Sequence, residues 1–407
     1  MKKKFKIKHK LSFKQKNIFL KVISIILLTV FLLIQLSLQN ISFANNENKE
    51  KIPILNSRRY IIFDRLSKRA LYGKDIDKET AMASTTKIMT AIIVLENCNN
   101  LKEEFTIPEK VSHVQGSTLG LKKDDKITLN DLLYGLLLRS GNDCAVALSI
   151  AIAENTENFI SLMNKKAKDL GLTKTHFVTP HGLDDPNHYT TPYELALITD
   201  YALKNEKFAK IVKTVNYTIQ INNVPKEIKN TNEVLCNNVE GVYGVKTGFT
   251  NNAGRCLVTS VKRNNLDFII IVLAADSRKY RAEDTVKLIN YAFKNYRYEN
   301  LETEITEEFN NWQYINLERI TVNKAQNKLR VVLGNYKIKS LATNKDITFE
   351  TNAISYKEAP IQKNEKVGNI IVKNGEEIIE TIDILAANNV ERRSIKDYYK
   401  MLLKVYA

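Results

Sequence analysis

The chain has 407 residues, 44% apolar and 26% charged, a composition typical of a globular protein of two to three domains rather than of a disordered or fibrous one. Its net charge of +16 raises the question of a nucleic-acid partner. Nine lysines and no acidic residue lie in residues 1–21, whereas the rest of the chain has only seven more basic than acidic residues, and this uneven distribution argues against nucleic-acid binding.

The lysine-rich start is followed by an apolar run at Val22–Leu38 and by Ser42-Phe43-Ala44. A basic stretch, an apolar core and small residues before a cleavage point are the features of a secretory signal. We therefore predict export, with residues 1–44 as a signal peptide cleaved after Ala44. An uncleaved anchor is the alternative, because 17 apolar residues are long for a signal core and short for a membrane span.

Residues 45–298 are predicted to form one α+β domain. Five segments have strand composition: 59–64, 69–73, 245–247, 256–262 and 267–275. Six segments have the apolar periodicity of helices: 86–96, 129–138, 144–153, 159–170, 193–202 and 283–293. A Pro/His/Asp-rich loop over 179–190 is a candidate lining of a site. Strands at both ends with helices between them predict an antiparallel sheet covered by helices.

The remaining chain is predicted to form a small all-β domain and a terminal helix. Short β-type runs separated by Asn, Lys and Gly turns mark the domain, which we place at 299–386. The tail, 387–407, puts Ile395, Tyr399 and Leu402 on one helical face and groups its lysines elsewhere. Such a basic amphipathic helix can lie on an anionic membrane surface as an anchor or pack on its own β-domain.

Four cysteines are too few for a disulfide scaffold in a chain of this length. Cys144 and Cys256 lie in apolar segments, where a free cysteine is an ordinary small core residue. The sequence has no CxxC or HxxxH motif, so no metal site and no cofactor are expected.

A serine and a lysine three residues apart open the first predicted helix, in Ser84-Thr85-Thr86-Lys87. This spacing places the hydroxyl and the amine on one helical face, a turn apart. Serine is a weak nucleophile unless a base lies within hydrogen-bond reach, and a lysine whose charge is disfavoured by burial or by a neighbouring cation can be that base. Alone, the pattern is common, and Ser84 could simply cap the helix.

Two further short motifs follow Ser84. Ser140-Gly141-Asn142 lies 56 residues after it, in a turn between two apolar helices, and Lys246-Thr247-Gly248 lies 162 residues after it, where strands resume. Separately, the first could be a helix connection and the second a solvated strand entrance. Together, in this order and on these element types, they predict a serine-nucleophile active site.

With these motifs the sequence resembles the low-molecular-mass penicillin-binding proteins that are serine-type D-alanyl-D-alanine carboxypeptidases of peptidase family S11. The resemblance covers 54–298, where Thr179-Pro180-His181-Gly182-Leu183 and Ala253-Gly254-Arg255-Cys256-Leu257 also match, and more loosely the β-domain. It implies the penicillin-recognising, β-lactamase-like fold, in which helices cover an antiparallel sheet.

The resemblance implies catalytic roles for Ser84, Lys87 and Ser140. Ser84 would attack the peptide carbonyl between two D-alanines and form an acyl-enzyme, with Lys87 as proton acceptor. Ser140 would protonate the leaving D-alanine, and Asn142 would orient Lys87 and the substrate amide. The backbone N–H groups of Ser84 and Phe249 would form the oxyanion hole.

It also implies a substrate-binding strand. Lys246 and Thr247 would hold the free carboxylate of the substrate, and Gly248 would leave room for the substrate at the strand edge. Arg281 stands where the family often has a second carboxylate-binding arginine, and nearby Arg278 is the alternative.

The expected substrate is therefore a peptidoglycan stem peptide ending in D-Ala-D-Ala, with β-lactams as covalent inhibitors and no nucleic-acid partner. The expected location is the extracellular face of the cytoplasmic membrane or the cell wall.

Two other functions share some of these features. A class A-like β-lactamase would use a Glu-x-x-x-Asn loop, which Glu154–Asn158 fits literally, but only 12 residues after Asn142 and at the end of a predicted helix. We interpret that match as chance. A non-catalytic wall-binding protein with the same fold would have no use for Ser84 and Lys87 together.

Overall fold

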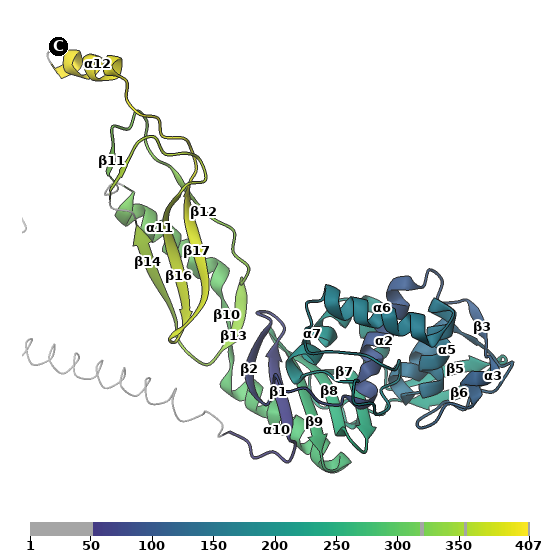
Figure 1. Ribbon diagram of the computed structural model, residues 1–407. Helices are drawn as coiled ribbons and strands as arrows, with labels where there is room; N and C mark the ends of the chain where they lie inside the picture. Colours follow the sequence, from purple (N-terminus) through teal and green to yellow (C-terminus); the bar gives the residue numbers. More distant parts are fainter. Residues whose placement is uncertain (1–51, 318–320, 354–355, 406–407) are drawn as a thin grey trace, which may run out of the picture. The chain divides into compact units, whose positions relative to one another are not determined.

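The computed structural model describes residues 52–317, 321–353 and 356–405 (Figure 1). The predicted signal peptide, 1–44, lies outside the described residues. Within the described part of the chain, no helix is both long enough and apolar enough to cross a membrane.

A five-stranded antiparallel sheet forms the centre of the first part of the chain, in the order β2-β1-β9-β8-β7. Its strands are β1 (Arg59–Asp64), β2 (Arg69–Lys74), β7 (Val242–Thr250), β8 (Gly254–Arg263) and β9 (Leu266–Ala275). The pairing of β1 with β9 joins the early and late strands, so the predicted antiparallel sheet is confirmed. β7 is an edge strand and extends beyond the predicted 245–247 on both sides.

Both faces of this sheet are covered, which explains the unbroken apolar sequence of β9. Ile269 and Ile271 belong to a large core shared with the helices, whereas Phe268 and Ile270 point the other way, because successive side chains of a strand alternate between its faces. The helices of the large core include α2 (Lys87–Asn97), α4 (Leu129–Tyr134), α5 (Asn142–Ala153), α6 (Thr156–Asp169), α7 (Pro192–Ala202) and α8 (Glu206–Lys213). The other face is covered by α10 (Arg278–Asn295) (Figure 1).

Several elements differ from the predicted ones. The predicted helix 129–138 is divided, because α4 ends at Tyr134 and a π-helical segment, η2 (Gly135–Arg139), continues to the Ser140 motif. A hairpin of β5 (Asn216–Ile221) and β6 (Val224–Lys229) was not predicted. β6 carries a proline and is exposed at all but one position, so it lacks the alternation that marks a half-buried strand.

Small elements complete this part of the chain: β3 (Glu104–Thr106), α3 (Glu109–Ser112), β4 (Lys126–Thr128) and α9 (Glu233–Cys236). All four cysteines lie among the described residues and are free, and Cys144 and Cys256 are buried in the core as predicted.

The C-terminal part contains the predicted β-rich fold. A four-stranded antiparallel sheet has the order β12-β17-β16-β14, built from β12 (Val331–Leu333), β14 (Ile347–Ala353), β16 (Lys366–Asn374) and β17 (Glu377–Ala386). Short strands pair beside it: β10 (Arg297–Asn300), β11 (Thr321–Asn323), β13 (Ser340–Thr343) and β15 (Tyr356–Glu358). The region is not all-β, because it also contains helix α11 (Leu301–Asn316), whose buried Trp312 joins the core.

The terminal helix α12 (Ile395–Val405) is present as predicted. Its apolar side chains are exposed rather than buried on the β-strands, with Ile395 88% and Leu402 59% accessible to solvent.

Candidate active site

The nucleophile candidate and its lysine come together where a short 3-10 helix, η1 (Ala83–Thr86), leads into α2. Ser84 is the second residue of η1 and Lys87 is the first of α2. Their side chains meet as the spacing predicts, with Lys87 Nζ 2.7 Å from Ser84 Oγ. Ala83 has φ of +48°, a left-handed conformation that turns the chain into the helix.

Lys87 is fully buried and has three polar neighbours. Its Nζ lies 2.7 Å from Ser84 Oγ, 2.7 Å from Asn142 Oδ1 and 2.8 Å from the His181 carbonyl oxygen. Burial holds the pKa of Lys87 well below its ordinary value, and the positive charge of Lys246 lowers it further. A neutral amine has two N–H donors, which the amide and carbonyl oxygens of Asn142 and His181 accept. Its lone pair is left for the Ser84 hydroxyl, which is the arrangement a proton acceptor needs.

The second motif lies between η2 and α5. Ser140 has a left-handed backbone, φ +65°, which ends η2, and Asn142 is the first residue of α5. Asn142 Nδ2 donates to the Gln115 carbonyl at 2.7 Å, and this bond fixes the amide so that its oxygen faces Lys87. The sharp turn thus brings Ser140 and Asn142 to the Ser84 side of the core.

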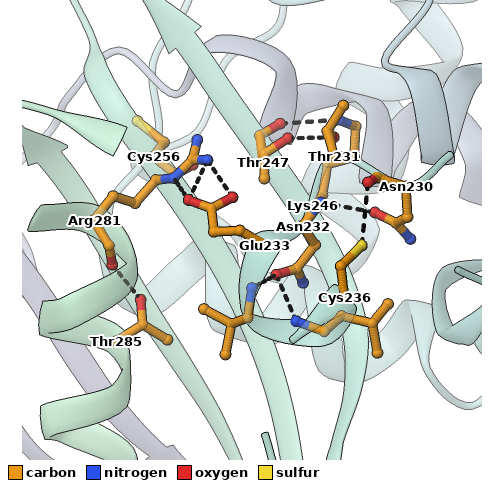
Figure 2. A network of polar contacts seen from close by, with 12 residues as sticks. Asn230, Thr231, Asn232, Glu233, Cys236, Lys246, Thr247, Cys256, Arg281 and Thr285 are labelled. Carbon is orange, nitrogen blue, oxygen red and sulfur yellow. Dashed lines mark hydrogen bonds and ion pairs between the residues drawn. The ribbon is translucent and has the colours of Figure 1, made fainter. Parts of the chain in front are cut away.

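The third motif lies on edge strand β7. Lys246 is buried and its Nζ donates to the Thr247 carbonyl at 2.9 Å. Burial, with the positive charge of Arg281 as a second cause, lowers the pKa of Lys246 to about 7. The Thr247 hydroxyl lies 2.7 Å from that of Thr231 (Figure 2). At Gly248 a Cβ atom would come within 3.1 Å of the Ser84 backbone nitrogen, so any larger residue would crowd η1 against the strand.

A cavity of about 400 Å³ opens onto these residues. Six of the predicted site residues line it: Ser84, Ser140, Thr247, Gly248, Phe249 and Arg281. Lys87, Asn142 and Lys246 are buried behind this lining. The cavity wall also contains Arg139, Arg255 and Arg278, so it is strongly cationic and suited to an anionic ligand.

Two arginines that line the cavity, Arg255 and Arg281, are held by different contacts. Phe249 is 46% exposed, and the Arg255 guanidinium lies over its ring at 3.4 Å, a cation–π contact. Arg281 is 3% exposed and forms a bidentate ion pair with Glu233. Of the two arginines considered from the sequence, both line the cavity, and Arg281 already has a carboxylate partner.

Residues 179–190, a candidate lining in the sequence, do not line the cavity but support the residues around Lys87 from behind. The His181 carbonyl binds Lys87, and the Pro180 carbonyl accepts the Thr90 hydroxyl at 2.6 Å. Burial lowers the pKa of His188 to about 4, so this histidine is neutral where its Nε2 meets Thr86 Oγ1 at 2.8 Å.

Sequence reasoning missed Thr231, Glu233 and Arg139 as parts of the site. None belongs to a recognisable motif, and their contacts depend on how β7, α9 and η2 come together. Arg255 was within a quoted matching stretch, although the sequence did not indicate its position over Phe249. Glu154, the residue of the β-lactamase alternative, is exposed at the end of α5 and does not line the cavity.

A family model described as D-alanyl-D-alanine carboxypeptidase matches residues 46–277, which is more than half of the chain. The chain belongs to this family. A second model, the C-terminal domain of penicillin-binding protein 5, matches residues 323–392. Membership makes the protein a serine hydrolase and confirms the resemblance drawn from the three motifs.

Individual members of the D-alanyl-D-alanine carboxypeptidase family support this placement. DacF of Bacillus subtilis is 28% identical over 378 residues, 88% of this chain and 92% of that protein. The Streptomyces K15 DD-transpeptidase structure is 35% identical with a TM-score of 0.58, covering 60% of this chain and 99% of that one. Penicillin-binding protein 5 of Haemophilus influenzae is 25% identical with a TM-score of 0.68, covering 84% of this chain and 100% of that one. The predicted penicillin-recognising fold is therefore confirmed.

Proposed function

We propose that this carboxypeptidase removes the terminal D-alanine from peptidoglycan stem pentapeptides through an acyl-enzyme on Ser84. The observation that carries the proposal is the environment of Lys87, a buried lysine whose two fixed acceptors leave its lone pair for the Ser84 hydroxyl.

In the acylation step, Ser84 Oγ attacks the carbonyl of the penultimate D-alanine and its proton passes to Lys87. The tetrahedral oxyanion is held by the backbone N–H groups of Ser84 and Phe249, donors that are typically worth about 3 kcal/mol each. As the C–N bond breaks, Ser140 supplies a proton to the leaving D-alanine nitrogen. Water then hydrolyses the ester, and transpeptidation differs only in that an amine attacks in place of water.

The substrate binds in extended form along edge strand β7, where main-chain hydrogen bonds add a peptide to the sheet. Lys246 and the Thr247 hydroxyl receive its C-terminal carboxylate, and Arg281 or Arg278 adds a second positive charge. β-Lactams take the same place and acylate Ser84, but their amine stays attached, so it does not leave room for water.

The deciding experiment measures D-alanine release from a stem pentapeptide, with Ser84→Ala compared with Ser161→Ala. Ser161 is an exposed serine on α6 and serves as a matched control. We expect release by the wild type and Ser161→Ala and none by Ser84→Ala, with one penicillin adduct on Ser84 by mass spectrometry. Folded protein without the adduct would refute the proposal, and steady nitrocefin turnover would favour the β-lactamase.

We also propose that the protein is exported and contacts the membrane through α12. Exposed apolar side chains on α12 alternate with Lys396 and Lys400, the pattern of a helix that lies in an anionic interface. Sedimentation with phosphatidylglycerol and phosphatidylcholine vesicles tests this contact. We expect binding to the anionic vesicles that is lost when the chain ends at residue 393, and equal sedimentation of both proteins would contradict it. N-terminal sequencing of the mature protein tests cleavage after Ala44.

A further inference from the structure

Arg281, which lines the cavity, is paired with a carboxylate of the protein itself. Arg281 Nε donates to Glu233 Oε1 at 3.0 Å, and Nη2 donates to Oε1 and Oε2 at 2.6 and 2.5 Å (Figure 2). Nη1 donates to the Cys256 carbonyl at 3.3 Å. The guanidinium group that lines the cavity is therefore engaged on all its donor-bearing nitrogens, most strongly by Glu233. A bidentate arginine–carboxylate pair is the same contact that a substrate carboxylate would make.

Glu233 is held in this position by the backbone before it. Asn232 caps the short helix α9, its Oδ1 accepting from the Val234 and Leu235 N–H groups. Its Nδ2 donates to the Gly244 carbonyl of β7 at 3.0 Å, which ties the start of α9 to the substrate strand. The Glu233 side chain is only 20% exposed. It is therefore held beside Arg281 rather than being a mobile surface charge.

The same segment meets the residue proposed to hold the substrate carboxylate. Thr231, two residues before Glu233, contacts the Thr247 hydroxyl at 2.7 Å. Arg281 is close enough to Lys246 for its charge to lower the pKa of that lysine. Glu233, Arg281, Lys246 and Thr247 therefore act on one small region, and a negative charge on Glu233 both occupies Arg281 and repels an incoming carboxylate.

We propose that Glu233 is a specificity-determining residue, an internal carboxylate that competes with the C-terminal carboxylate of the substrate for Arg281. The inference rests on the proposed function, since it assumes that the cleft receives a peptide with a free C-terminus. Its consequence is that Lys246 and Thr247 carry most of the carboxylate recognition in the wild type, while the ion pair with Glu233 limits the contribution of Arg281.

The test compares Glu233→Gln with Glu240→Gln. Glu240 also faces an arginine, Arg263, at 3.9 Å, but it is exposed and outside the cavity, so it is a matched control. The probes are diacetyl-Lys-D-Ala-D-Ala and its C-terminal carboxamide, with benzylpenicillin and its methyl ester as acylating agents. Assays at pH 6 keep Lys246 mainly protonated, because its pKa is about 7.

For Glu233→Gln we expect KM for the free acid to fall about tenfold with kcat unchanged, the factor that one charge-assisted hydrogen bond provides. Acylation by benzylpenicillin rises by a similar factor, while the carboxamide and the methyl ester react as with the wild type. Glu240→Gln is expected to react like the wild type with all four probes. Equal changes for the charged and uncharged probes, or no change, would overturn the proposal.

Neutralising Glu233 leaves Arg281 buried without its partner, so the single variant could fold poorly. The double variant Glu233→Gln/Arg281→Gln removes both charges, so it tests the proposal without leaving a buried charge unpaired. We expect its KM for the free acid to stay within about threefold of the wild type, because the pair contributes little net charge. A tenfold rise would show that Arg281 anchors the substrate despite Glu233, and would refute the inference. If the wild type itself released no D-alanine from the stem pentapeptide, that result would refute the proposed function instead.

Discussion

The titration of Lys246 makes the activity of this enzyme sensitive to pH just above neutrality. Only the protonated amine can hold a substrate carboxylate, and burial beside Arg281 lowers the pKa of Lys246 to about 7. The protonated fraction is then about a half at pH 7, a tenth at pH 8 and a hundredth at pH 9. Since kcat/KM reports the free enzyme, it is expected to fall about fivefold from pH 7 to 8 and about tenfold from pH 8 to 9.

The assay is D-alanine release at low substrate concentration between pH 6 and 9. Two variants separate Lys246 from other groups. Lys246→Arg carries a charge that does not titrate in this range, so its profile is expected to stay flat above pH 7. Lys246→Met has no charge, so its kcat/KM at pH 6 should already be at the low level that the wild type reaches near pH 9. A wild-type profile that is flat to pH 9, or a parallel decline in Lys246→Arg, would refute the reasoning.

Three further changes test other parts of the structure. Asn142→Asp places a negative charge beside Lys87 and should raise the pKa of Lys87. The rate of penicillin acylation should then begin to fall at a higher pH as the solution is made more acidic. An unchanged pH profile would contradict the role of Lys87 as the proton acceptor. Gly182→Ala brings a Cβ atom to 1.9 Å from the Ala83 carbonyl oxygen. Thermal denaturation should show that the free energy of unfolding falls by at least ~2 kcal/mol, and acylation by penicillin should be lost. Normal acylation would contradict this expectation. Trp312→Ala should lower unfolding free energy by about 3–5 kcal/mol in the C-terminal part while Ser84 still reacts with penicillin, whereas lost reaction in folded protein would argue otherwise.

The sequence was informative where chemistry demands particular residues at short spacing. Ser84 and Lys87 share one helical face whatever the rest of the fold does, so their contact followed from three residues of separation. The Ser140 turn and the β7 motif were recognisable for the same reason. The large antiparallel sheet was predictable because its covered strands are strongly apolar and flank a helical middle.

What the sequence could not reveal depends on contacts between distant segments. Glu233 lies 48 residues from Arg281, and nothing in the local pattern near α9 distinguishes it from a surface glutamate. Helix α11 was missed because the residues from 299 onward were assigned to one β-domain, although acidic residues in a first turn favour a helix start through the helix dipole. The β5–β6 hairpin was missed because β6 is almost wholly exposed, so burial imposes no alternation on its sequence.

Arg281, Lys246 and Lys87 are coupled through their charges, because the charge of each shifts the pKa of the next. The positive charge of Arg281 lowers the pKa of buried Lys246, and the charge of Lys246 in turn lowers the pKa of Lys87. A substrate carboxylate bound at Lys246 favours the protonated form of that lysine. The charge thus retained disfavours protonation of Lys87 at the moment when the base is needed. Binding of the C-terminus and activation of Ser84 are therefore coupled through two buried lysines, and the coupling requires both to be removed from water.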